Sequence, residues 1–176
     1  PCGVFWRDEN EIHELFAGAG GLAMGVAKAG FKHCAAIEWD SDSCDTLRFN
    51  KERGVVPIKN WPLFQSDVRF FDYGPYQDKV DLISGGPPCQ PFSLGGKHRG
   101  NNDNRDMFPE AVRAVREVRP KAFMFENVKG LLRETFSKYF EYIVLQLSYP
   151  DIRKKRDEDW QSHLARLEKQ HTGGKE

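Results

Sequence analysis

The glycine-rich turn FAGAGG at residues 16–21 restricts the possible folds more than any other feature of the sequence. It lies between an apolar segment, expected to be a strand over residues 11–16, and a helix expected over residues 21–29 with Gly30 at its C-cap. Glycines here let the backbone turn sharply and let a ligand come close, and the helix N-terminus offers free N–H groups. The turn therefore predicts a nucleoside-cofactor site at the edge of an α/β sheet.

Strand-like and helix-like segments continue to alternate along the chain. Further strands are predicted over residues 33–37, 62–66, 80–84 and 122–125, and further helices from Ser41, as N-cap, to before Gly54 and over residues 105–118 and 135–147. This alternation favours a doubly wound, mostly parallel α/β sheet.

The length of 176 residues suits one domain. We place that domain at residues 11–150, after an extension at 1–10 and before a highly charged segment at 151–176. The charged segment is interpreted as a solvated helix with a frayed end, and the alternative is a docking surface for a partner.

Composition gives few indications of partners. The 26 basic and 26 acidic residues leave no net charge, so charge alone does not indicate nucleic acid. No apolar run approaches the ~20 residues that span a bilayer, and the start lacks the features of a signal peptide. We therefore expect a cytoplasmic protein without a membrane partner.

The cysteines do not suggest a metal or a disulfide framework. None of Cys2, Cys34, Cys44 and Cys89 forms a C-x-x-C pair, so a zinc site is not expected. Without a secretory signal, disulfides are not expected either.

An acidic residue, Glu38, ends the strand that follows the glycine turn, and Trp39 stands beside it. A carboxylate in this place can accept hydrogen bonds from both ribose hydroxyls, and an indole can stack on adenine. Residues 18–23 also fit the G-x-G-x-x-G/A fingerprint. The turn thus leaves open a nicotinamide cofactor, S-adenosylmethionine, and a structural turn without a ligand.

The segment GGPPCQPFS at residues 85–93 follows a predicted strand and opens a loop expected over residues 85–104. Ligands bind beyond the carboxyl ends of strands in an open α/β sheet, which places Cys89 on the functional edge. The flanking prolines stiffen the loop. Cys89 is therefore the candidate nucleophile, provided that its surroundings favour the thiolate.

The motifs FAGAGG, IEWD, GGPPCQPFS and ENV occur in that order within residues 12–133. Together they resemble the cofactor and catalytic motifs of the cytosine-5 methyltransferases, and the stretch after the cysteine is similar to bacterial members. The resemblance implies a Rossmann-like, S-adenosylmethionine-dependent methyltransferase fold, incomplete at its C-terminal end. It also implies double-stranded DNA as substrate, in a restriction-modification or related system.

The resemblance implies roles for individual residues. Cys89 would add to C6 of a flipped-out cytosine, and Glu126 would contact N3 and the exocyclic amine. The residues implied for the cofactor are Phe16, Gly18, Gly20, Gly21, Glu38, Trp39, Asp67, Val68 and Pro87. The residues implied for DNA are Gln90, Ser93, Lys97, Arg99 and Asn127.

Some parts of complete family members are not found in this sequence. There is no Gln-x-Arg-x-Arg strand and no target-recognition region. Either a truncation or a split enzyme with a second chain is expected, and the isolated chain is expected to lack site-specific methylation. The alternatives are a tRNA cytosine-5 methyltransferase of the same family, a non-catalytic remnant and a nicotinamide-dependent oxidoreductase.

Overall fold

The computed structural model of the chain describes residues 10–88 and 106–173. The chain divides into two compact units. The first unit comprises Pro1–Gly86 and Glu117–Glu126, and the second comprises Pro87–Arg116 and Asn127–Glu176. Each unit is described by itself.

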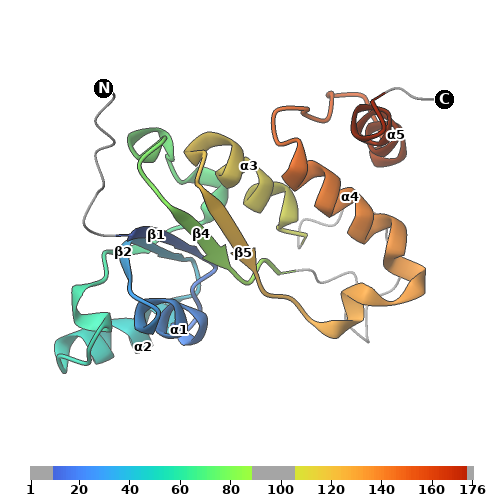
Figure 1. Cartoon of the computed structure of the whole chain (residues 1–176). Coiled ribbons are helices and arrows are strands. Elements are labelled where there is room, and N and C mark those ends of the chain that lie inside the picture. The colour runs from blue at the N-terminus through green and yellow to red at the C-terminus, as the bar shows by residue number, and fades with distance from the viewer. Residues whose placement is uncertain (1–9, 89–105, 174–176) are drawn as a thin grey trace, which may run out of the picture. The chain divides into compact units, whose positions relative to one another are not determined.

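The first unit contains a five-stranded sheet, in which every pairing between neighbouring strands is parallel (Figure 1). Its strands are β1 (Asn10–Leu15), β2 (Phe31–Glu38), β3 (Leu63–Gln65), β4 (Leu82–Gly85) and β5 (Ala122–Phe125), in the order β3-β2-β1-β4-β5. From β1 the chain builds outward to β3 and then returns to the other side of β1. The strand order therefore reverses between β1 and β4, which is where open α/β sheets bind ligands.

The central strands β1 and β2 read as nearly continuous buried runs rather than as an alternating pattern. Ile12, Leu15, Ala36 and Ile37 are all fully buried. This is the pattern of inner strands in a parallel sheet, where both faces are covered.

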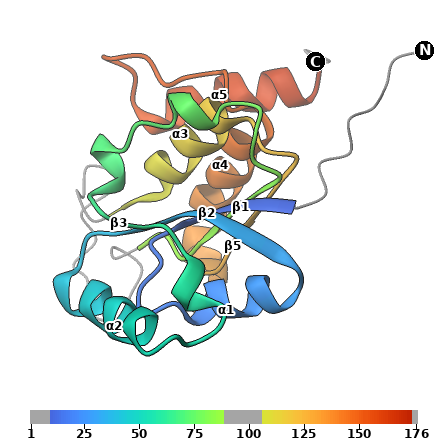
Figure 2. The same cartoon turned by 90° about the vertical axis from the view of Figure 1, so that its left-hand side faces the viewer.

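Two helices of the first unit, α1 (Gly21–Lys28) and α2 (Ser41–Glu52), lie on the same side of the sheet (Figure 2). Asp40, not Ser41, is the N-cap of α2, because the extended backbone of Asp40 lets its carboxylate accept from the amide of Ser43 at 2.8 Å. The predicted cap at Ser41 is wrong by one residue. A buried cluster of Ala23, Leu47, Ile58 and Trp61 fixes the two helices to each other.

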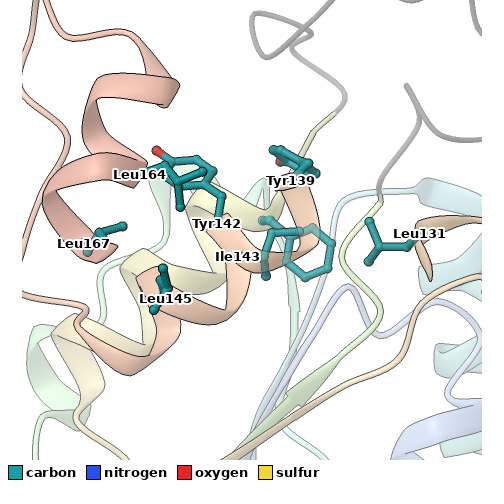
Figure 3. Packing of buried hydrophobic residues seen from close by; sticks show 8 residues of the cluster. Leu131, Tyr139, Tyr142, Ile143, Leu145, Leu164 and Leu167 are labelled. Atoms are coloured by element: carbon teal, nitrogen blue, oxygen red, sulfur yellow. The ribbon is translucent and has the colours of Figure 1, made fainter. Parts of the chain in front are cut away.

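The second unit contains α4 (Ser137–Ser148), α5 (Trp160–His171) and most of α3 (Phe108–Val118). Their core is a cluster of large apolar side chains, which are Phe108, Leu131, Tyr139, Tyr142, Ile143, Leu145, Leu164 and Leu167 (Figure 3). The N-cap of α5 is Asp159, whose carboxylate accepts from Ser162 N at 2.7 Å. Within the charged segment after position 150, Trp160–His171 thus form a helix with a buried face.

Short 3-10 helices occupy Ile58–Asn60, Val68–Phe70, Gly74–Tyr76, Lys129–Leu132 and Glu134–Phe136. The sequence did not predict them. Helix α3 begins at Phe108, three residues after its predicted start, with Pro109 in its first turn, where the missing N–H is tolerated. Among the described residues, no helix is long and apolar enough to span a membrane.

Candidate cofactor and catalytic site

The glycine turn after β1 has three residues in the left-handed region. Phe16 has φ 53°, Gly18 has φ 52° and Gly20 has φ 91°. A positive φ is unusual for a phenylalanine and marks a constrained turn. The amide of Gly20 donates to Ala17 O at 2.9 Å, which closes the turn directly before α1.

Two glycines of this turn face open space, and one is required for packing. A Cβ on Gly18 or Gly21 would meet no atom within 4 Å. A Cβ on Gly20 would come within 2.9 Å of Leu47 Cδ2 and 3.1 Å of Trp61 Cζ3. Gly20 therefore lets the turn rest on the core, while Gly18 and Gly21 leave room for a ligand above the turn.

Glu38 joins the glycine turn to the end of β2. Its Oε2 accepts from Gly18 N at 2.7 Å, and its Oε1 accepts from the amides of Trp39 and Asp40, both at 2.8 Å. A carboxylate has about four acceptor sites, so one remains on Oε2. The side chain is buried but not sealed, with 7% of its surface exposed.

The end of β3 brings a second carboxylate to this edge. Ser66 N donates to Glu38 O at 2.9 Å, which places the following residue, Asp67, next to the end of β2. Both carboxylate oxygens of Asp67 accept from Arg69: Oδ1 accepts from Nε at 3.0 Å, and Oδ2 accepts from Nε at 2.9 Å and from Nη2 at 2.5 Å. This ion pair lowers the pKa of Asp67.

These residues fit an adenosine moiety. The indole of Trp39 is 70% exposed and so offers a stacking face. Glu38 offers a free acceptor site beside the open space over Gly18. Val68, which follows Asp67 in the chain, is buried and anchors the 3-10 helix Val68–Phe70 in the core.

Glu126, at the end of β5, lies beside the segment that leads to Cys89. The amide of Glu126 donates to Gly85 O at 3.0 Å. Its Oε2 lies 3.6 Å from the position that a Cβ of Gly86 would occupy. The exposed carboxyl group thus lies next to the backbone of Gly86, within the first unit.

The backbone on the other side of this segment is held within the second unit. Asn127 Nδ2 donates to Pro87 O at 2.8 Å, and Asn127 Oδ1 accepts from Val128 N at 2.9 Å. Pro87 is buried, and the carbonyl of Pro88 accepts from Met107 N at 3.0 Å. The peptide just before Cys89 is therefore fixed by side-chain and backbone bonds.

A family model described as C-5 cytosine-specific DNA methylase matches residues 11–150. The chain belongs to this family. It is 46% identical over 135 residues to the Type II methyltransferase M.NgoMIV of Neisseria gonorrhoeae, covering 77% of this chain and 41% of that protein. It is 37% identical over 150 residues to the Type II methyltransferase M.AquIA of Picosynechococcus sp., covering 81% of this chain and 58% of that protein.

The solved structure of another protein has the same fold as this DNA methylase chain. The protein is assigned as a DNA modification methyltransferase encoded within an E. coli prophage, and it matches with a TM-score of 0.60 and 29% identity. The match covers 80% of this chain and 38% of that structure. The chain thus spans between about two-fifths and three-fifths of the length of these relatives.

Five of the residues predicted for the DNA methylase site lie outside the described residues. They are Cys89, Gln90, Ser93, Lys97 and Arg99. The described residues Phe16, Gly18, Glu38, Trp39 and Asp67 are brought to the carboxyl ends of β1, β2 and β3.

Sequence reasoning missed a buried polar group under the methylase site. Glu14 on β1 accepts a hydrogen bond from Ser84 Oγ on β4, and both are fully buried. Burial raises the pKa of Glu14 to about 7 and lowers the pKa of the neighbouring His33 to about 4. Although Glu14 Oε2 and His33 Nε2 are 4.0 Å apart, we interpret them as a neutral pair, because burial disfavours both charges.

A cavity among the described residues lies elsewhere in the methylase chain. It holds about 610 Å³ in the second unit and is lined by Asp106, Pro109, Tyr139, Tyr142, Asp157 and Trp160, among others. None of the residues predicted for the cofactor lines it. Over residues 10–88 and 106–173, no group of three His, Cys, Asp or Glu side chains could hold a metal ion.

Proposed function

We propose that this chain supplies the cofactor-binding and catalytic part of a DNA cytosine-5 methyltransferase of a restriction-modification system. The observation that carries the proposal is the carboxyl edge of the first unit. There Glu38 accepts a hydrogen bond from the glycine turn, and Glu126 lies next to Gly86, three residues before Cys89. Since the chain spans 41% and 58% of two relatives named Type II methyltransferases, the activity of the whole protein, with any second chain, is part of the proposal.

S-Adenosylmethionine is the proposed cofactor, and it supplies a methyl group on a positively charged sulfur. Glu38 would accept from the ribose hydroxyls through its remaining acceptor site, and Trp39 would stack on the adenine. Asp67 would accept from the adenine amino group. Phe16, Gly18, Gly20, Gly21, Val68 and Pro87 would shape the surrounding backbone and walls.

In the proposed reaction the thiolate of Cys89 adds to C6 of cytosine, and the electron pair of the C5–C6 double bond becomes available at C5. C5 would then take the methyl group as the bond between the methyl carbon and the positively charged sulfur breaks, which leaves a neutral thioether. The C5 proton would pass to solvent, and the C6–S bond would break to return the thiolate. Glu126 would hold N3 and the exocyclic amine, where charge changes most as sulfur adds. Cytosine C5 is inaccessible in a duplex, so the base must be flipped out.

Contacts to DNA are proposed for Gln90, Ser93, Lys97 and Arg99. Asn127 is also proposed to contact DNA, and its hydrogen bond to Pro87 O supports a second role. By holding the peptide two residues before Cys89, Asn127 would limit the directions in which the thiol can point.

Calorimetric titration with S-adenosylhomocysteine tests the cofactor site. Glu38→Gln replaces a carboxylate that accepts hydrogen bonds from three backbone amides by a side-chain amide with one acceptor oxygen. The affinity of the variant for S-adenosylhomocysteine should therefore fall about 10- to 100-fold. Glu52→Gln, an equivalent change at the exposed end of α2, should leave affinity unchanged. Equal affinities of the two variants would contradict the proposed cofactor site.

Covalent trapping on duplex DNA that contains 5-fluorocytosine tests the nucleophile. Cys89→Ser should abolish the adduct, while Cys34→Ser, at a half-buried cysteine on β2, should retain it. Competition between duplex DNA and tRNA in the same assay separates the two substrate classes. Trapping that persists in Cys89→Ser, or that tRNA but not DNA suppresses, would argue against the proposal.

A further inference from the structure

A buried polar pair joins β1 and β4 where the strand order of the sheet reverses. Glu14 and Ser84 are direct partners in the parallel register of these strands, and both are 0% exposed. Ser84 Oγ donates to Glu14 Oε2. Each residue is the last but one of its strand, so the bond lies directly before the end of β1, where the glycine turn begins, and directly before the end of β4, which Gly86 follows.

Strands β1 and β4 approach each other very closely at this point. A Cβ on Gly85 would lie 2.2 Å from Leu15 O, so β4 can approach β1 only because residue 85 lacks a side chain. The Glu14–Ser84 bond lies one residue earlier in both strands. Any change in this pair must therefore move the backbone that leaves the sheet on one side or the other.

No cation compensates the carboxyl group of Glu14 within the described residues. Its Oε1 has no hydrogen-bond partner there. The titratable side chain that faces it is His33 on β2, whose ring packs on Trp61 with 4.4 Å between centroids. Helix α1 packs against β2 and β4, and its one charged residue, Lys28, stands in its last turn. Ionised Glu14 would thus be a buried, unpaired charge.

We propose that Glu14 is a positioning residue, which in its neutral form holds the glycine turn and the segment before Cys89 at the spacing that methyl transfer requires, and which weakens cofactor binding when it ionises. The inference rests on the proposed function for its consequence, but its structural part can be tested without a cofactor. An ionised carboxyl group at this position draws in water or separates the strands, because the described residues around it offer no counter-charge. Since burial raises the pKa of Glu14 to about 7, this change falls within the physiological pH range.

The structural part is tested by following the amide signals of Gly18 and Gly86 in nuclear magnetic resonance spectra between pH 5.5 and 8.5. In the unmodified chain both signals should shift with one common midpoint near pH 7. Glu14→Gln keeps the size and an acceptor for Ser84 but cannot titrate, so both shifts should disappear. Glu52→Gln is the matched control and should retain them.

Ser84→Ala provides an independent variant. The hydrogen bond from Ser84 lowers the pKa of Glu14 against the larger effect of burial, so its loss should raise the common midpoint. If Glu14 had a merely structural role, Ser84→Ala would not move this midpoint. Signals that titrate separately, or that still titrate in Glu14→Gln, would overturn the proposal, and Ser84→Ala decides it if Glu14→Gln does not fold.

The functional part is tested by the affinity for S-adenosylhomocysteine at pH 6 and pH 8.5. Affinity should fall at least about fivefold over this range in the unmodified chain and remain level in Glu14→Gln. Binding with the same pH dependence in both proteins would refute the coupling while leaving the proposed cofactor intact. Absence of binding at every pH would refute the proposed cofactor and with it the functional part, whereas the amide signals would still decide the structural part.

Discussion

Replacing Glu14 by glutamine should change how the free energy of unfolding depends on pH. The pKa of Glu14 is raised from 4.5 to about 7 by burial in the folded chain. Between these values the folded chain binds a proton that the unfolded chain has lost. The free energy of unfolding therefore falls as pH rises through this window, and the loss is complete above pH 7.

The size of this loss follows from the shift. A rise of about 2.5 in pKa, at 1.36 kcal/mol for each unit, corresponds to about 3 kcal/mol. Glutamine does not titrate, so the variant should gain up to this amount over the unmodified chain between pH 4.5 and 7.5. His13, whose pKa burial lowers to about 4, destabilises both proteins alike below pH 6.5 and so cancels in the difference.

Urea unfolding at intervals from pH 5 to pH 8, followed by tryptophan fluorescence, measures this difference. Glu52→Gln, with its exposed side chain, should run parallel to the unmodified chain at every pH. A difference for Glu14→Gln that stays constant over the whole range would refute the reasoning.

Three further substitutions test other contacts. Gly85→Ala would place a Cβ 2.2 Å from Leu15 O and should lower the free energy of unfolding by about 3 kcal/mol; urea unfolding that matches the unmodified chain would contradict the close approach of the strands. Arg69→Ala should release Asp67 and tighten S-adenosylhomocysteine binding up to about fivefold at low salt, an effect that fades at high salt; weaker binding would show that Arg69 supports the ligand. Asp40→Ala should lower the urea midpoint by removing a helix cap, and an unchanged midpoint would argue against that cap.

The sequence predicts the parallel sheet well because its strands are short apolar runs between strong turn signals. The strand at Ala122–Phe125 has the predicted bounds, between Pro120 and the motif ENV. The glycine turn and Glu38 also lie together as expected, since strand order and a positive φ at Gly18 bring them into contact. These features depend on local residues, which a sequence displays directly.

The features that the sequence does not reveal depend on long-range contacts. Nothing local marks Glu14 and Ser84 as partners, because 70 residues separate them and a glutamate in a strand is more often solvated. The bidentate contact of Arg69 with Asp67 depends on the side-chain directions of a 3-10 turn that no periodicity predicts. The packed face of α5 was likewise hidden by the high charge of its segment.

The carboxylate of Glu38 receives three amide protons from its own chain, so it is oriented before any ligand arrives. Immobilising a flexible side chain on association costs about 0.5–1.5 kcal/mol. Because Glu38 is already ordered when the chain folds, ligand binding does not incur this cost at Glu38. A nucleoside would thus encounter a rigid acceptor and need not induce one. Discrimination between nucleosides would then depend on the other contacts around it, such as the exposed indole of Trp39 and the side chain of Arg69.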